Sequence, residues 1–160
     1  MNKNFSKIKE LDGKQLYYSF LAGAQRIFDN QKLLNKIHVF QVPDADTGTN
    51  MASTMRSLTD TSIPTGSLKQ SATALADADL VGDRGNSGII FAQFLYGFSN
   101  EIKTEKNINV NSFAGIIDKF VDYAYEAIAN PVEGTIITVI KDWAESVNNL
   151  KDKIDDFKKL

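Results

Sequence analysis

Two carboxylates lie two residues apart in the loop VPDADTGTN, which runs from residue 42 to residue 50. Asp44 and Asp46 can point into one small volume there, and such a pair repels itself unless a cation or protons intervene. Mg²⁺ is the natural cation, because it prefers oxygen ligands and is commonly held by one or two carboxylates together with nucleotide phosphates. The loop therefore predicts a magnesium site.

Small and polar residues follow this pair at the point where a helix is expected to begin. They are Thr47, Gly48, Thr49 and Asn50. The free N–H groups and the dipole at a helix start favour an anion, so metal and phosphate would meet there. The alternative is an ordinary helix N-cap, in which Asp46 or Thr47 caps the helix and Asp44 is only solvated. The spacing of the two acids leaves both interpretations open.

A second loop, VGDRGNSG at residues 81–88, places three glycines around polar side chains just before the most apolar segment of the chain. A backbone with small side chains can approach a ligand closely, although the loop matches neither a Walker motif nor a dinucleotide fingerprint. The predicted phosphate-binding residues here are Gly85, Asn86, Ser87 and Gly88. A glycine-rich turn that only caps a buried helix is the alternative.

A third loop, NPVEGT at residues 130–135, enters another helical segment. Gly134 and Thr135 could contact phosphate or ribose there, and a plain N-terminal turn is the alternative. Helices that all begin at the same end of a bundle would bring the three loops to one rim. Together they predict a site that no single loop establishes.

The elements that must position these loops are helical, because apolar residues recur at spacings of three and four. Helices are expected at residues 12–30, 49–58, 67–78, 86–98, 112–129 and 134–149, and a last amphipathic piece holds Ile154, Phe157 and Leu160. Asn111 or Ser112 is expected to cap the fifth helix. Short loops join neighbours that lie side by side, so residues 1–160 are expected to form one all-α domain, an antiparallel up-and-down barrel or bundle of about seven helices.

Composition excludes several classes of function. The chain has no cysteine, which rules out disulfides and thiolate metal sites, and its only histidine is His38. A net charge of −2 gives no general attraction for nucleic acid. No apolar run approaches the roughly 20 residues that cross a bilayer, and the start lacks a signal-peptide segment, so a cytoplasmic protein is expected.

The motifs VPDADTGTNM, GDRGNSGII and PVEGTIITVI, in this order and at these separations, resemble the DhaL-type (Dak2) domain. The closest resemblance is to the amino-terminal nucleotide-binding domain of bacterial fatty acid kinases, and the family is related to the nucleotide-binding subunit of dihydroxyacetone kinases. The resemblance implies an antiparallel helical barrel that binds ATP or ADP with two Mg²⁺ ions at one end. It also implies an ATP-dependent phosphotransferase whose acceptor is presented by a partner, such as a fatty-acid-binding subunit.

By this resemblance Asp44 and Asp46 are metal ligands, Thr47 and Asn50 line the nucleotide, and the loop from Asn86 to Gly88 cradles phosphates. Gly134 and Thr135 match a third contact segment. These enzymes position ATP and neutralise developing charge, so no residue is expected to act as a strong base. The chain is expected to be inactive without its partner or further domains.

Four positions depart from the family pattern. Ala45 and His38 stand where the family usually has Gly and Asn, and Asp83 replaces a small residue. We expect Asp83 to face solvent paired with Arg84, the alternatives being a further metal ligand or a charge that repels ATP. We expect His38 to be a core or capping residue rather than a metal ligand. Val39 stands where dihydroxyacetone kinase subunits have a further aspartate, which makes that subunit the second choice; a non-catalytic nucleotide-binding or interaction module is the third. The sequence names neither the acceptor nor the oligomeric state.

Overall fold

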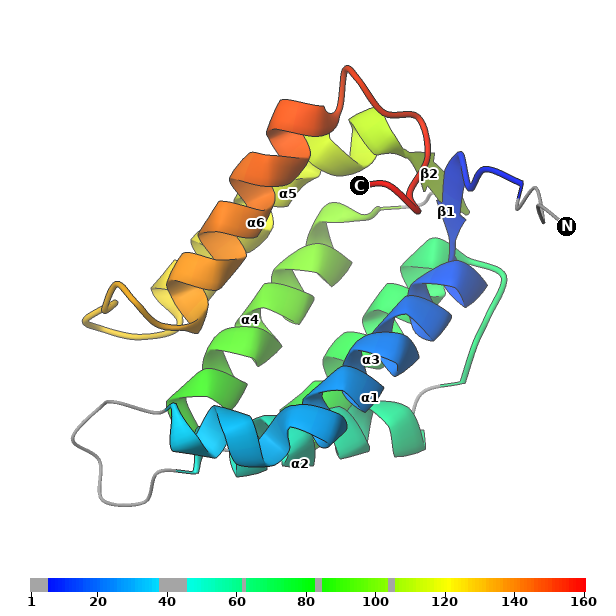
Figure 1. The fold of residues 1–160 in the computed structure, drawn as a ribbon. Helices are drawn as coiled ribbons and strands as arrows, with labels where there is room; N and C mark the ends of the chain where they lie inside the picture. The colour runs from blue at the N-terminus through cyan, green and yellow to red at the C-terminus, as the bar shows by residue number, and fades with distance from the viewer. Residues whose placement is uncertain (1–5, 38–45, 62, 83–84, 104–105) are drawn as a thin grey trace, which may run out of the picture.

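Six α-helices make up most of the residues that the computed structural model describes, which are 6–37, 46–61, 63–82, 85–103 and 106–160 (Figure 1). The helices are α1 (Gly13–Lys36), α2 (Thr47–Thr61), α3 (Leu68–Gly82), α4 (Gly85–Glu101), α5 (Val110–Glu126) and α6 (Ile136–Leu150). Two short strands of the described chain, β1 (Glu10–Asp12) and β2 (Asn107–Asn109), pair antiparallel. The all-α fold class predicted from the sequence is confirmed.

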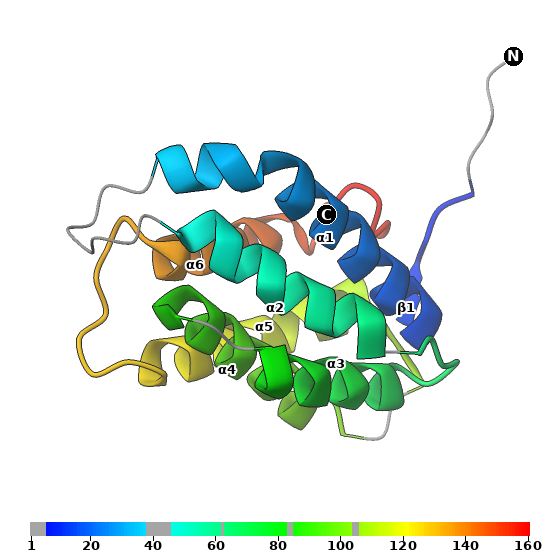
Figure 2. The same ribbon diagram turned by 90° about the horizontal axis from the view of Figure 1, so that it is seen from below.

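The helices run up and down, so that the starts of α2, α4 and α6 lie at the same end of the bundle (left in Figures 1 and 2). Helix α4 lies in the middle, packed against α3 and α5, while α1 packs against α2 and α3. Helix α6 packs against α5. The three helices that follow the predicted loops therefore begin at one end of the bundle, as the sequence predicts.

Helix α1 is longer than the sequence pattern predicts, continuing beyond Asn30 to Lys36. A capping box fixes its start: the Asp12 carboxylate accepts from the Gln15 N–H at 2.8 Å, and the Gln15 side chain accepts from the Asp12 N–H at 2.9 Å. No glycine or proline interrupts the chain between Asn30 and Lys36, so nothing in the sequence ends the helix earlier. The extra turns carry α1 to the same end of the bundle as the start of α2.

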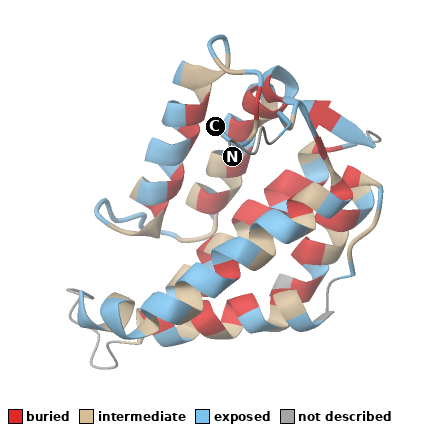
Figure 3. Cartoon of the chain, turned by 45° about the vertical axis from the view of Figure 1, so that its right-hand side comes forward, coloured by how far each residue is buried: buried red, intermediate tan, exposed pale blue. Residues whose placement is uncertain are grey.

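The core consists of apolar residues on the helix faces that turn toward one another, and Figure 3 shows this as lengthwise stripes of buried residues. Aromatic rings form its centre, with Phe120 fully buried and its ring centroid 4.9 Å from that of Phe98. Edge-to-face pairs of this kind add to the stabilisation that burial provides. None of the described helices is long and apolar enough to span a bilayer.

Two further details differ from the sequence-based expectations. Residues 151–160 form turns instead of a seventh helix, because the Asp156 carboxylate accepts from the N–H groups of Ile8 and Lys158, and the Phe157 N–H donates to the Ile8 carbonyl. These bonds offer the backbone an alternative to helix hydrogen bonds.

The fifth helix begins earlier than expected, since Asn109 is its N-cap and accepts from the Ser112 N–H at 2.9 Å.

Candidate functional site

The start of α2 meets the start of α4 through the side chain of Asn50. Its Nδ2 donates to Oδ1 of Asp46 at 2.9 Å, and the same atom lies 2.8 Å from the position that a Cβ on Gly85 would take. Gly85 has φ +64°, a left-handed conformation that glycine adopts without strain. Residues from the first and second predicted loops are therefore in direct contact.

The rest of the glycine-rich loop lies on the first turn of α4. Asn86 is exposed, Ser87 is half-buried and Gly88 is buried. The first N–H groups of a helix have no partner within the helix, so the starts of α2 and α4 both favour an anion, although the Thr49 N–H of α2 already donates to Asn35. The arrangement suits an anion held between two helix starts.

Two side chains from the end of α1 hold the start of α2, and the sequence analysis did not identify them. The Thr49 N–H donates to Oδ1 of Asn35 at 3.1 Å, while Thr49 Oγ1 accepts from Asn35 Nδ2 at 3.0 Å and from Gln31 Nε2 at 3.2 Å. Gly48 packs directly on α1, since a Cβ there would overlap the Gln31 carbonyl oxygen. The only signal in the sequence is two amide side chains four residues apart on α1.

The third loop lies at the same end of the bundle (Figures 1 and 2). Most of its hydrogen bonds are formed within the loop and with the first turn of α6. Thr135 is the N-cap of α6, where its hydroxyl donates to the Val132 carbonyl at 2.8 Å and accepts from the Ile137 N–H at 3.4 Å. Gly134 has φ +82°, and its N–H donates to Oγ1 of Thr138 at 2.9 Å. The loop is thus a well-formed helix cap at the rim of the candidate site.

The Glu133 side chain connects the third loop to α5, which precedes it, and to α6, which follows it. Its carboxylate accepts from the Thr138 hydroxyl at 2.6 Å and from the Tyr125 hydroxyl at 3.2 Å. The hydrogen bond from Thr138, helped by the one from Tyr125, holds the pKa of Glu133 below its usual value. Burial and the same carboxylate raise the pKa of Tyr125.

One of the two predicted metal ligands lies among the described residues, and its oxygen atoms are of the kind that a hard cation prefers. Asp46 offers carboxylate oxygens beside two helix starts, and within the described chain its Oδ2 has no hydrogen-bond or ion-pair partner. No group of three acidic or histidine side chains forms among those residues. Four predicted positions, Asp44, Asp83, Arg84 and His38, lie outside them. Of the two predicted metal ligands, only Asp46 lies among the described residues.

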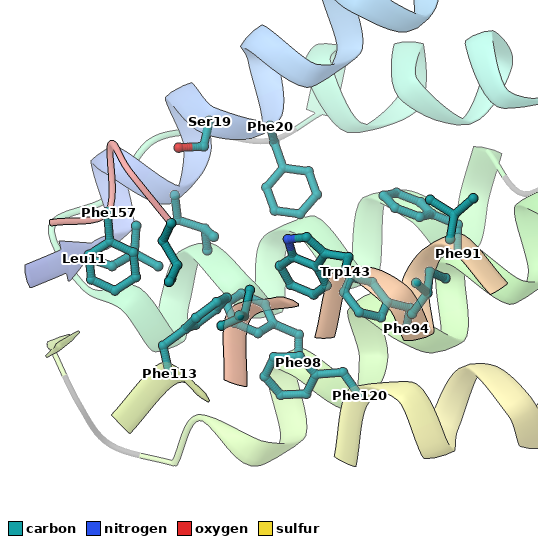
Figure 4. Close-up of a pocket in the computed structure, with 15 residues that line it drawn as sticks. Leu11, Ser19, Phe20, Phe91, Phe94, Phe98, Phe113, Phe120, Trp143 and Phe157 are labelled. Carbon is teal, nitrogen blue, oxygen red and sulfur yellow. The ribbon is translucent and has the colours of Figure 1, made fainter. Parts of the chain in front are cut away.

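A separate apolar cavity of about 460 Å³ opens between α1, α4, α5 and α6 (Figure 4). Its walls are mainly aromatic: they include Phe20, Phe91, Phe94, Phe98, Phe113 and Trp143. None of the residues predicted from the three loops lines it. The polar candidate site and the apolar cavity are distinct features of the bundle.

Known proteins of similar sequence share the region that carries the site. Protein YloV of Bacillus subtilis (strain 168) is 42% identical over 155 residues, which cover 96% of this chain and 28% of that protein. Uncharacterized proteins of Staphylococcus haemolyticus and Staphylococcus aureus are 39% and 38% identical over 153 and 157 residues, covering 93% and 92% of this chain. They match over 27% and 28% of their own length, so this chain spans little more than a quarter of these relatives.

The family model for the DAK2 domain matches residues 41–160. The matched region includes the starts of α2, α4 and α6, and with them all three loops. Proteins with DhaL-type domains generally bind ADP or ATP. The chain therefore belongs to the DAK2 domain family and has the fold of a DhaL-like nucleotide-binding module.

Proposed function

We propose that this chain is the Mg²⁺-nucleotide-binding domain of a kinase, which holds ATP while its γ-phosphoryl group passes to an acceptor presented by a partner protein. The observation that carries the proposal is the contact of Asn50 with both Asp46 and Gly85. It brings an acidic loop and a glycine-rich helix start together, as a metal bound to nucleotide phosphates requires.

Each group has a definite part in this proposal. Asp46, together with Asp44, would bind two Mg²⁺ ions, which when bound supply positive charge to the phosphates. The N–H groups at the starts of α2 and α4 would orient the phosphate oxygens, with Asn86 and Ser87 as further donors. The chain thus positions the nucleotide and stabilises its charge, and a partner supplies the group that attacks.

The proposed acceptor is a fatty acid carboxylate carried by a fatty-acid-binding protein. It rests on the sequence resemblance to the amino-terminal domain of fatty acid kinases, and the relatives described above leave it open. A sugar-binding partner, as in dihydroxyacetone kinases, would give the same nucleotide site another acceptor. Incubation with ATP and each type of partner separates them, because acyl phosphate or sugar phosphate forms only with the matching one.

The nucleotide part is tested by isothermal titration calorimetry with ADP, with and without Mg²⁺. The wild-type chain should bind ADP in a Mg²⁺-dependent manner, and the Asp44→Ala/Asp46→Ala double variant should lose that binding. Asp60→Ala is a matched control, because Asp60 is an exposed acid near the far end of α2. Tight Mg²⁺-dependent binding by the double variant would reject the site. Nucleotide binding without phosphoryl transfer to either partner would favour a non-catalytic module.

A further inference from the structure

The start of α2 is capped in an unusual way. The Asp46 carbonyl accepts the first hydrogen bond of the helix, from the Asn50 N–H at 2.8 Å, so Asp46 occupies the N-cap position. An N-cap aspartate ordinarily uses its carboxylate to accept from the N–H two or three residues further along the helix. Here the residue three positions on is Thr49, and its N–H donates instead to Asn35 of α1.

Asn35 therefore takes over the hydrogen bond that the Asp46 side chain would otherwise make. Its amide forms a two-point contact, accepting from the Thr49 N–H and donating to the Thr49 hydroxyl. Gln31, one turn earlier, donates to the same hydroxyl. All three side chains belong to the described chain, and the two amides on α1 are half-buried.

The consequence concerns the carboxylate of Asp46. Its Oδ1 accepts from the Asn50 side chain, and no described hydrogen bond ties it to a backbone N–H of the helix. The carboxylate is held by Asn50, whose side chain lies against Gly85 at the start of α4. A carboxylate that also capped the helix would be turned toward the helix N–H groups and would have fewer lone pairs left to face a cation.

We infer that Asn35, supported by Gln31, is a positioning residue for the cation site: it caps α2 from a neighbouring helix and so releases the Asp46 carboxylate to bind Mg²⁺. This inference rests on the function proposed above. It assigns Thr49 to the support of the site, with its hydroxyl and N–H committed to α1. A neutral amide suits the task, because it satisfies the helix start without adding a negative charge next to the metal.

Calorimetry on Asn35→Ala provides the test. Loss of a residue that supports a metal ligand typically weakens metal affinity about 10–100-fold. The variant should therefore need at least about tenfold more Mg²⁺ for half-maximal binding of ADP, while ADP affinity without Mg²⁺ stays unchanged. Asn30→Ala is the matched control, since Asn30 lies on α1 and bonds only the Arg26 carbonyl of its own helix among the described residues. Equal Mg²⁺ dependence in the two variants would overturn the inference.

The variants Thr49→Val and Thr49→Ser distinguish a supporting role of Thr49, through Asn35, from direct contact between Thr49 and the nucleotide. The serine variant keeps the hydroxyl that Asn35 and Gln31 contact and should bind like the wild type, whereas the valine variant should resemble Asn35→Ala. Combining Asn35→Ala with Thr49→Val should add little further loss if both residues act through one contact. Additive losses would mean that Thr49 touches the nucleotide itself, and the assignment of Thr49 would be wrong.

A second measurement distinguishes failure of the inference from failure of the proposed function. Mn²⁺ without nucleotide should broaden the NMR signals of Asn50 and Gly85 in the wild-type chain and leave them sharp in Asn35→Ala. If the wild type binds no Mg²⁺-ADP, the proposed function fails, yet this difference would still support the positioning role of Asn35. Identical broadening in both proteins, or none in the wild type, would overturn it.

Discussion

The side chain of Asn50 lies directly against Gly85, with Nδ2 only 2.8 Å from the position of a Cβ at that glycine. A side chain at residue 85 would therefore displace Asn50 from its contact with Asp46. The glycine is also held at φ +64°, so that both space and backbone conformation require its lack of a side chain. This one contact joins the two helix starts on which the candidate site depends.

Gly85→Ala should destabilise the chain by about 1–2 kcal/mol, which is the cost of a left-handed conformation in an L-residue. The variant should also weaken Mg²⁺-dependent ADP binding, because Asn50 must move. Urea unfolding and calorimetry measure the two effects. Gly23→Ala is the control: a Cβ on that α1 glycine meets nothing within 4 Å, and alanine should stabilise the helix by about 0.5–1 kcal/mol. Unchanged ADP binding by Gly85→Ala would contradict the importance of this contact.

Thr135→Ala should lower the free energy of unfolding by about 1 kcal/mol, the usual cost of losing an N-cap side chain. The Thr135 hydroxyl already contacts Val132 and Ile137, so we expect ADP affinity to stay near that of the wild type. Thr135→Ser keeps the cap and should retain wild-type stability. A large loss of ADP affinity in the alanine variant, restored by serine, would show instead that this hydroxyl binds nucleotide.

Phe120→Ala should cost about 3–5 kcal/mol of stability, because a large fully buried ring is replaced by a cavity. Phe120 packs edge-to-face against Phe94, Phe98 and Phe113, so the loss also removes three aromatic contacts. Urea unfolding followed by far-UV circular dichroism measures the change. Tyr18→Ala is the control, because its side chain is 59% exposed and its removal should change stability little.

Stability should depend on pH through Asp155 in the acid range. Hydrogen bonds and charge attraction from Lys7 and Lys9 lower the pKa of Asp155 from 3.8 to about 2. The ionised carboxylate therefore stabilises the fold above pH 3.8, and its contribution is lost as the pH falls toward 2. The urea midpoint of Asp155→Asn should lie below that of the wild type at neutral pH and approach it in acid. Asp152→Asn, at a nearby exposed aspartate, is the control. If the difference in urea midpoint between Asp155→Asn and the wild type stayed constant with pH, the ionised Asp155 carboxylate would not be the source of the pH dependence.

The sequence predicted the helices well because their apolar periodicity is long and regular. Residues 112–129 and 134–149 correspond to α5 and α6, with ends that differ by up to three residues. The rim of helix starts also followed from the sequence, since up-and-down helices joined by short loops must begin in turn at the two ends of a bundle. Periodicity within one helix therefore determined most of the architecture.

What the sequence could not predict depends on contacts between distant segments. The spacing of Ile154, Phe157 and Leu160 suits a helix, but the Asp156 carboxylate bonds to the Ile8 N–H at the other end of the sequence. Strands of three residues are too short for an alternating pattern to be recognised. Asn35 looked like any polar residue on the solvent side of α1, because nothing in a single sequence says which neighbour a side chain meets.

Trp143 is the only tryptophan of the chain and stands at the edge of the aromatic cavity, 38% exposed and in edge contact with Phe94 and Phe113 (Figure 4). The protein thus carries a built-in optical probe, because indole emission responds to the polarity around the ring. Its spectrum should shift when an apolar molecule fills the cavity, whereas a nucleotide bound at the rim should leave it nearly constant. Two measurements can therefore follow two separate regions: calorimetry reports binding at the rim, and tryptophan fluorescence reports binding in the cavity.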